Sequence, residues 1–285
     1  MTTEDVLKNA KGGIALIGEV IKAAGDNPQV REAGLELGKT AVTITRTINN
    51  VLLPLAAFNF AVEKARIYFA EQFPDDMARK AKNIPQEAVI EPKSSVAGPA
   101  LQGLAFCHEE QNLKEMYLNL LASAMDGRVA RLAHPAFVEI IKQIDAEEAK
   151  LLQSVLATDH PFPIAEVFFT ADKGKFKPTT ITLYRHLLNL QNDNSDDPAE
   201  DAFLPAMVDN WIRLGLVNVD YGLSLVDHDY DWVESRPEFI LQRSKITAEG
   251  IVTFHKGVMK KTAWGLQFSQ AAGLSTLPMT INQAD

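Results

Sequence analysis

The sequence predicts a mainly α-helical protein. Apolar residues recur every three or four positions along the N-terminal and central parts, which is the period of an amphipathic helix. Segments of strict apolar–polar alternation are scarce, and the C-terminal part indicates helices followed by short extended stretches. We therefore expect an N-terminal helical hairpin, a central helical domain and a C-terminal winged-helix-like module with a small β-hairpin. These parts correspond to residues 1–75, 84–160 and 161–262, followed by a tail at residues 263–285.

Composition is that of an intracellular globular protein. The chain has 285 residues, of which 46% are hydrophobic, enough for two or more domains of roughly 100–200 residues each. Its one cysteine, Cys107, cannot form an internal disulfide, and this favours a reducing compartment. We expect Cys107 to be a small buried apolar residue rather than a nucleophile. Residues 1–5 do not begin a secretory signal, so we expect a cytoplasmic location.

Acidic residues dominate the charge. The net charge is -9, and residues 191–238 alone carry twelve acidic side chains against Arg213 and Arg236. This stretch is interpreted as a solvated acidic surface, with a docking face for a basic partner as the alternative. The helix expected at residues 202–214 would face a DNA groove in a winged helix, yet it offers Asp209 and a single basic residue. We therefore expect no specific nucleic-acid binding.

The N-terminal part contains two predicted helices. The first spans residues 7–21 and the second begins near residue 29, with Pro54 kinking or splitting it. Residues 47–62 are uncharged but fall short of the roughly 20 apolar residues of a membrane span, so we expect a buried or interfacial helix. The central domain, a second subunit or lipid could cover it, and self-association is preferred because most oligomers are symmetric copies of one chain. The candidate partner or membrane contacts are Leu52, Leu55, Phe58 and Phe60.

The central part has the strongest helical pattern. We expect it to open at Gly98-Pro99, with proline in the first helical turn. A long stripe over residues 113–124 should end at Gly127 in a left-handed cap, and another helix should start at His134-Pro135. Residues 145–148 form a capping box for a third helix. The residues predicted to form one core are Leu120, Leu121, Phe137, Ile140, Ile141 and Leu152.

The C-terminal part is less regular. Residues 181–190 and 202–214 are predicted to be helices, and residues 216–219 a short strand. A second short strand is expected at residues 239–241, and a last helix at residues 247–259. After Lys261 the periodicity is lost, as in a loosely attached tail.

No motif indicates catalysis. The chain has no phosphate-binding glycine loop, no nucleophile elbow and no pair of histidines at helical spacing. Residues 227–231, around His228, are the most metal-like cluster, but an acidic surface loop is the preferred interpretation. We therefore expect no catalytic, cofactor-binding or metal site, and an action through binding rather than through chemistry.

Three segments resemble a known family. They are residues 92–101 (PKSSVAGPAL), 116–126 (MYLNLLASAMD) and 133–142 (AHPAFVEIIK). Together they resemble the abortive infection alpha family, a former domain of unknown function, over about residues 84–259. Residues 213–216 (RLGL) and 246–250 (ITAEG) extend the likeness. The family has no established catalytic residues, so none is transferred.

The resemblance implies bacterial defence against phage, in which an infected cell stops growing or dies. The function predicted is thus non-enzymatic anti-phage defence through protein or membrane contacts. The protein would be a homo-oligomer in the cytoplasm or at the inner face of the membrane. A cytoplasmic adaptor or regulator that docks protein through the winged-helix-like module is the alternative. An enzyme with an unrecognised site is the third hypothesis.

Overall fold

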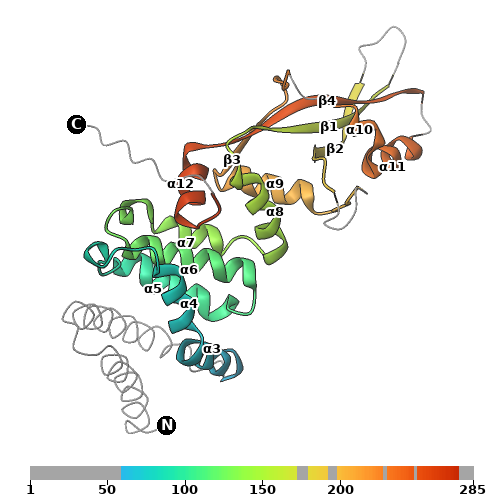
Figure 1. Ribbon diagram of the computed structural model, residues 1–285. Coiled ribbons are helices and arrows are strands. Elements are labelled where there is room, and N and C mark those ends of the chain that lie inside the picture. Colours follow the sequence, from blue (N-terminus) through green and yellow to red (C-terminus); the bar gives the residue numbers. More distant parts are fainter. Residues whose placement is uncertain (1–58, 172–178, 192–197, 227–229, 247–248, 276–285) are drawn as a thin grey trace, which may run out of the picture. The chain divides into compact units, whose positions relative to one another are not determined.

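The computed structural model describes residues 59–171, 179–191, 198–226, 230–246 and 249–275, with residues 59–63 and 179 described for their backbone only. The chain falls into two compact units (Figure 1). The first comprises Met1–Ala149 with Ala271–Gly273, and the second comprises Lys150–Gln270 with Leu274–Asp285.

The first unit is helical. Its long helices pack around α6, which touches α4, α5 and α7. The elements are α3 (Asn59–Glu71), α4 (Phe73–Ala81), a 3₁₀ turn (Gln86–Ala88), α5 (Ser94–Cys107), α6 (Gln111–Met125), a second 3₁₀ turn (Ala130–Leu132), α7 (Ala136–Ile141) and the first turn of α8 (Ala146–Ala157). The apolar stripe predicted for α6 is confirmed, because its large side chains, such as Met116 and Leu120, are buried.

The predicted core residues are all buried. Leu120, Phe137 and Leu152 have no exposed surface, and Leu121 exposes only 3% of its own. Ile140 and Ile141 are buried beside them on α7. Leu152 lies in the part of α8 that belongs to the second unit.

Helix ends agree only partly with the predictions. The capping box is confirmed, because Asp145 Oδ1 accepts the backbone N–H of Glu148 at 2.7 Å. The start expected at Gly98-Pro99 is wrong, since α5 begins at Ser94 and Pro99 lies inside it. Gly98 has no Cβ to crowd the proline ring, which eases this arrangement.

The end of α6 lies where it was predicted, with Asp126 as the cap residue, but the cap conformation was predicted wrongly. Gly127 does not adopt a left-handed conformation. Its N–H instead donates to Ala88 O at 2.7 Å, and a Cβ there would lie 3.1 Å from the same oxygen. Glycine is needed at this position because another backbone approaches closely.

An ion-pair network joins α4 to α6. Pro74 lies in the first turn of α4, where the missing proline N–H costs no hydrogen bond. Glu115 on α6 accepts Arg79 at 2.8 Å and Lys80 at 2.5 Å. The Arg79 guanidinium in particular lowers the pKa of Glu115 to about 2.

The second unit is built on an antiparallel sheet. Its strands are β1 (Phe162–Ala171), β2 (Thr179–Leu187), β3 (Val217–Asp220) and β4 (Gly250–Lys261), in the order β2-β1-β4-β3. The central pair is long and regular, running from Phe162 opposite Met259 to Ala171 opposite Gly250. The helices of this unit are α9 (Leu204–Arg213), α10 (Trp232–Ser235), α11 (Pro237–Lys245), the rest of α8 and most of α12 (Ala263–Ala271).

This sheet contradicts the predicted fold class. The protein is not a mainly helical chain with a small winged-helix hairpin, because β1, β2 and β4 have 10, 9 and 12 residues. The helices predicted at residues 181–190 and 247–259 fall largely on β2 and β4. Both strands contain β-branched residues, whose fit to a sheet depends on the strands beside them.

Three other assignments were tested in this unit. The helix at residues 202–214 and the strand at residues 216–219 are confirmed as α9 and β3. The strand expected at residues 239–241 is wrong, because it lies in α11. Helix signals were present there, with Pro237 and Glu238 in the first turn and Lys245 in the last.

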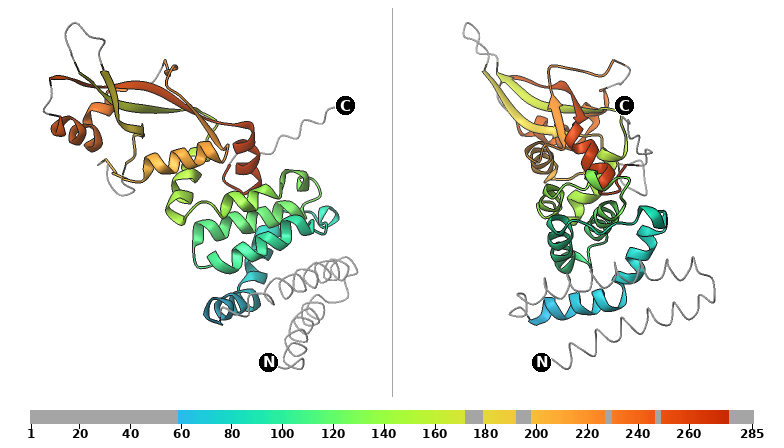
Figure 2. Two further views of the ribbon diagram at one scale, coloured as in Figure 1. Left: turned by 180° about the vertical axis from the view of Figure 1, so that it is seen from behind. Right: turned by 90° about the vertical axis from the view of Figure 1, so that its left-hand side faces the viewer.

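Helices cover one face of the sheet (Figure 2). Ala165 and Val167 of β1 and Leu187 of β2 form a buried cluster with Tyr230, Val233 and Phe239. Tyr230 also donates a hydrogen bond from Oη to Gly257 O on β4, at 2.7 Å.

A buried ion pair holds the connection between β2 and α9. Arg236 donates to Glu238 through Nε at 3.1 Å and through Nη2 at 2.8 Å. The same guanidinium donates to Leu190 O and Ala199 O, each at 2.5 Å. Arg236 exposes only 1% of its side chain and Glu238 only 8%.

The C-terminal segment contains a helix. In α12, which lies where no periodicity was seen, Phe268 is fully buried. Among the described helices, none is both long and apolar enough to cross a lipid bilayer.

Candidate functional site

The residues predicted to contact a partner or membrane are not placed by the structure. Leu52, Leu55 and Phe58 lie outside the described residues. Phe60 lies in α3, but its side chain is not described. These contacts therefore remain predictions.

The metal-like cluster is described only in part. Residues 227–229, including His228, lie outside the described residues. Tyr230 is buried in the core of the second unit, and Asp231 precedes α10 on the surface. Within the described ranges, no three His, Cys, Asp or Glu residues are grouped so that they could hold a metal ion.

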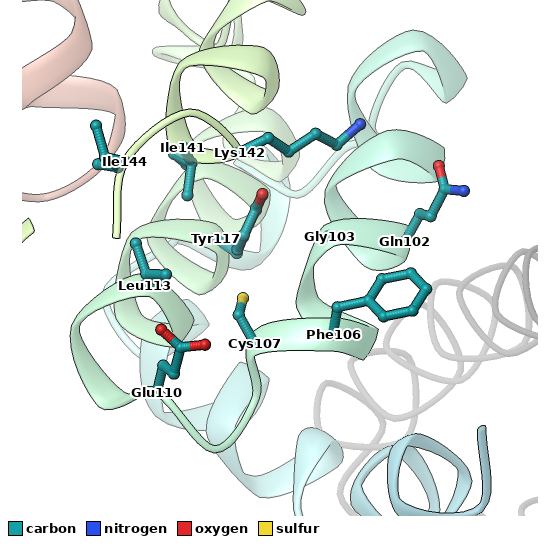
Figure 3. Close-up of a pocket in the computed structure, with 10 residues that line it drawn as sticks. All are labelled: Gln102, Gly103, Phe106, Cys107, Glu110, Leu113, Tyr117, Ile141, Lys142 and Ile144. Atoms are coloured by element: carbon teal, nitrogen blue, oxygen red, sulfur yellow. The ribbon is translucent and has the colours of Figure 1, made fainter. Parts of the chain in front are cut away.

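Among the described residues, a groove on the helical unit is a candidate for a binding site (Figure 3). It lies among α5, α6 and the end of α7 and has a volume of about 400 Å³. The residues that line it are Gln102, Gly103, Phe106, Cys107, Glu110, Leu113, Tyr117, Ile141, Lys142 and Ile144. A groove of this size falls in the range of roughly 300–1,000 Å³ typical of ligand sites.

The groove suits apolar side chains. Leu113, Ile141 and Ile144 form part of its wall, and Phe106 exposes 56% of its surface at the rim. The polar lining includes Lys142, whose ammonium pairs with Glu139 at 2.9 Å. An exposed aromatic beside an apolar hollow is typical of a surface that binds another apolar group.

The polar atoms at the base of the groove stay uncharged at neutral pH. Burial raises the pKa of the Cys107 thiol to about 12, and burial also raises the pKa of Tyr117 above its usual value. Cys107 is free and buried, as the sequence predicted. Because a thiolate is the reactive form of cysteine, this thiol is a poor nucleophile.

A close helix contact shapes the base of the groove. A Cβ on Gly103 would lie 2.4 Å from Tyr117 Oη, so only glycine lets the phenol ring rest against α5. Figure 3 shows Tyr117 directed toward α5, with Cys107 Sγ directed into the same hollow. The Tyr117 phenol thus forms part of the lining.

A second polar cluster lies on the sheet of the second unit. The pairing of β1 with β2 shifts between Ala165–Leu187 and Val167–Tyr184, which inserts one extra residue into β2. His186 occupies this β-bulge with a φ of 56°, a left-handed conformation that costs a non-glycine residue about 1 kcal/mol or more.

The bulge directs His186 into the protein. Its ring contacts Asp209 Oδ1 through Nε2 at 3.1 Å and Tyr221 Oη through Nδ1 at 2.9 Å. The backbone N–H of His186 donates to the same phenol oxygen at 3.1 Å. A neutral ring with its hydrogen on Nε2 satisfies all three contacts. Gly257 leaves room for Tyr221, because a Cβ there would lie 2.5 Å from the ring.

The hydrogen bonds of His186 to Asp209 and Tyr221 hold separate elements together, which is a structural role. His186 exposes only 1% of its surface, and both ring nitrogens are occupied. Burial lowers the pKa of His186, although Asp209 opposes the effect, and burial raises the pKa of Tyr221 to about 12. The ring therefore stays neutral and fixes β2 to α9 and to the residues after β3.

The sequence predicted neither the groove on the helical unit nor the His186 cluster on the sheet. Residues 181–190 were assigned to a helix, and no local signal announces a left-handed histidine. Tyr117 and Leu113 were recognised only as core positions. Their shared groove appears because α5 and α7 leave the space beside α6 unfilled.

Comparison with known proteins identifies the family. A family model described as abortive infection alpha matches residues 65–272. The chain belongs to the abortive infection alpha family. No curated protein and no solved structure matches the chain significantly.

The stretch matched to the abortive infection alpha family contains every residue that lines the groove. The three segments that carried the resemblance supply α7, most of α6 and the first half of α5. Residues 1–64 precede the matched stretch, so Leu52, Leu55, Phe58 and Phe60 are not part of it.

Proposed function

We propose that this protein is a non-enzymatic effector of abortive-infection defence against phage, acting through contacts of its helical unit. Membership of the abortive infection alpha family over residues 65–272 is the observation that carries the proposal. The groove beside Phe106 supports a mechanism by contact, because it offers a largely apolar hollow of about 400 Å³.

The proposed location is the cytoplasm or the inner face of the membrane, and the proposed state is a homo-oligomer. The uncharged residues 47–62 support both, since such a stretch needs another copy, another part of the chain or lipid to cover it. Membrane fractionation and light scattering on the full chain test the two statements separately. A monomer would contradict the homo-oligomer, and a protein found wholly in the soluble fraction would exclude the membrane.

We also expect no specific duplex DNA binding. In the sequence, α9 lies within residues 191–238, which contain twelve acidic residues, so we expect phosphate to be repelled. A gel-shift assay at physiological salt checks this, and a sequence-dependent shift would contradict it.

A phage challenge tests the defence role. Cells expressing the protein should reduce plaque formation at least tenfold relative to cells with an empty vector. Phe106→Asp should abolish most of this protection, because a charge would replace the exposed aromatic at the groove. Val226→Asp is the matched control, since Val226 is 96% exposed on the other unit and its replacement should change nothing.

Two outcomes would contradict the proposal. Equal plaque counts with and without the gene, over a broad phage panel, would remove the defence role. Folded His186→Asn protein that loses protection would instead support an enzymatic or ligand-binding role for the buried cluster. Asparagine tolerates the left-handed conformation, so this variant should fold.

A further inference from the structure

We propose that the groove on the helical unit binds residues 47–58 of the same chain. This inference concerns the resting protein and does not depend on the defence role. Three observations carry it: the place where the described chain begins, the apolar character of the groove, and the composition of the residues that precede α3.

The described chain begins beside the groove. Lys64 on α3 donates to Glu109 at 2.7 Å, and the Tyr68 ring stacks on His108 with centroids 5.0 Å apart. These two partners lie in the corner between α5 and α6, with Cys107 on one side and Glu110 on the other. Both of those flanking residues line the groove.

Lys64 and Tyr68 therefore anchor α3 next to residues that line the groove. Asn59 precedes Lys64 by five residues, a rise of about 7.5 Å along a helix. Leu55 and Phe58 precede that point by at most four residues in the sequence. We expect this short tether to let the two side chains reach Phe106 and the hollow behind it.

The chemistry of the two partners matches. Residues 47–58 read TINNVLLPLAAF, with no charged side chain and several large apolar ones. The groove has room for a few such side chains, and Phe106 would be covered together with them. Cys107 and Tyr117 remain uncharged at its base, so no buried charge opposes the docking of an apolar segment.

Residues 47–58 of the same chain are favoured over those of a second copy as the occupant of the groove, because they are covalently linked to α3. A short linker holds its segment at an effective concentration of roughly millimolar, well above that of free protein in a dilute solution. A second copy has to supply the same side chains without this advantage.

The single cysteine provides the test. Cys107 Sγ faces the groove (Figure 3), so one added cysteine is enough to trap a neighbour. In the full chain, Leu52→Cys, Leu55→Cys and Phe58→Cys are each oxidised at mildly alkaline pH. Non-reducing gels and mass spectrometry of digests then identify the disulfides. We expect an intramolecular bond to Cys107 from at least one variant, lost on Cys107→Ala and absent from the control Thr2→Cys.

Labelling of the native thiol gives a second readout. The rate at which Cys107 reacts with a small neutral maleimide is compared between the full chain and Leu55→Asp/Phe58→Asp. We expect at least fivefold faster labelling in the variant, because charged residues should leave the groove. Circular dichroism verifies that both proteins are folded, and denatured protein gives the maximal rate.

The same experiments distinguish the other possible partners, a second copy of the chain and lipid. A disulfide that links two chains would overturn the proposal and assign the groove to a second copy. No disulfide together with unchanged labelling would also overturn it. Co-sedimentation of that full chain with anionic liposomes would then assign residues 47–58 to lipid. None of these results depends on phage, so failure of the defence role would be recognised separately.

Discussion

Replacing Arg236 by methionine should destabilise the second unit strongly. The guanidinium is buried, pairs with both oxygens of Glu238 and caps two carbonyl groups, Leu190 O and Ala199 O. Methionine fills most of the same volume but donates no hydrogen bond. The carboxylate of Glu238 would then be left buried without a partner.

The expected magnitude follows from this geometry. Breaking a buried ion pair by removing one partner costs about 3–5 kcal/mol, because the remaining charge is uncompensated. The two orphaned carbonyls fall within this figure rather than adding to it, since water can enter once the ring of contacts is broken. Against a total stability of about 5–15 kcal/mol, the loss is large enough to measure.

Tryptophan fluorescence isolates the unit concerned. The three tryptophans of the chain, Trp211, Trp232 and Trp264, all lie in the second unit. Urea titrations followed by their emission give the free energy of unfolding of Arg236→Met. Arg213→Met is the matched control, because Arg213 is exposed and donates to Asn210, which lies three residues away on the same helix, so its cost should stay below about 0.5 kcal/mol.

A double variant separates the charge from the packing. Arg236→Met/Glu238→Gln contains no buried charge, so its loss should be smaller than the sum of the two single losses by about 1–3 kcal/mol. A loss below about 1 kcal/mol for Arg236→Met alone would refute the reasoning. Strict additivity of the two substitutions would refute the part assigned to the unpaired carboxylate.

Three further predictions concern both units. Gly103→Ala should cost about 1–3 kcal/mol despite the better helix propensity of alanine, since its Cβ meets the Tyr117 phenol, whereas Gln102→Ala should change the free energy of unfolding by less than about 0.5 kcal/mol. Far-UV circular dichroism in urea measures both, and equal stabilities would show that Tyr117 moves freely. Leu121→Ala should cost about 2–5 kcal/mol in the same assay, and a change near zero would contradict its burial. The pKa of His186 is lowered by burial, so the unfolded chain binds its proton more readily, and the second unit should lose stability as pH falls through about 6.5. Asn at that position should flatten this dependence in the tryptophan signal between pH 7.5 and 5.5, and an unchanged slope would assign the effect to other groups.

The helical unit could be predicted well because the buried residues of each helix recur at helical spacing in the sequence. Leu113, Met116 and Leu120 repeat with helical spacing, and each is buried in α6. The capping box at Asp145 was equally local, because its donor and acceptor lie three residues apart. The start of α5 was missed, since tolerance of Pro99 depends on Gly98 and on packing around the helix.

The sheet could not be predicted in the same way. β2 and β4 contain apolar residues at spacings compatible with either a helix or a strand. The pairing of β1 with β4, over ten residues that are distant in sequence, decides the outcome. The β-bulge at His186 exists only because β2 pairs with β1, and its hydrogen bonds need α9 and the residues after β3.

The candidate site shows the same division. By itself the sequence determined that Cys107 would be buried and that the chain resembles the abortive infection alpha family. That residues 47–62 need cover stays a prediction from the sequence. These properties depend on composition and local order along the chain. Only the tertiary structure decided that Phe106 would remain exposed beside a groove, and that Lys64 of α3 would bond to Glu109, next to Glu110 of the groove lining. The physical reason is that a groove is a space left between helices, and no single segment contains the information on how its neighbours fail to fill it.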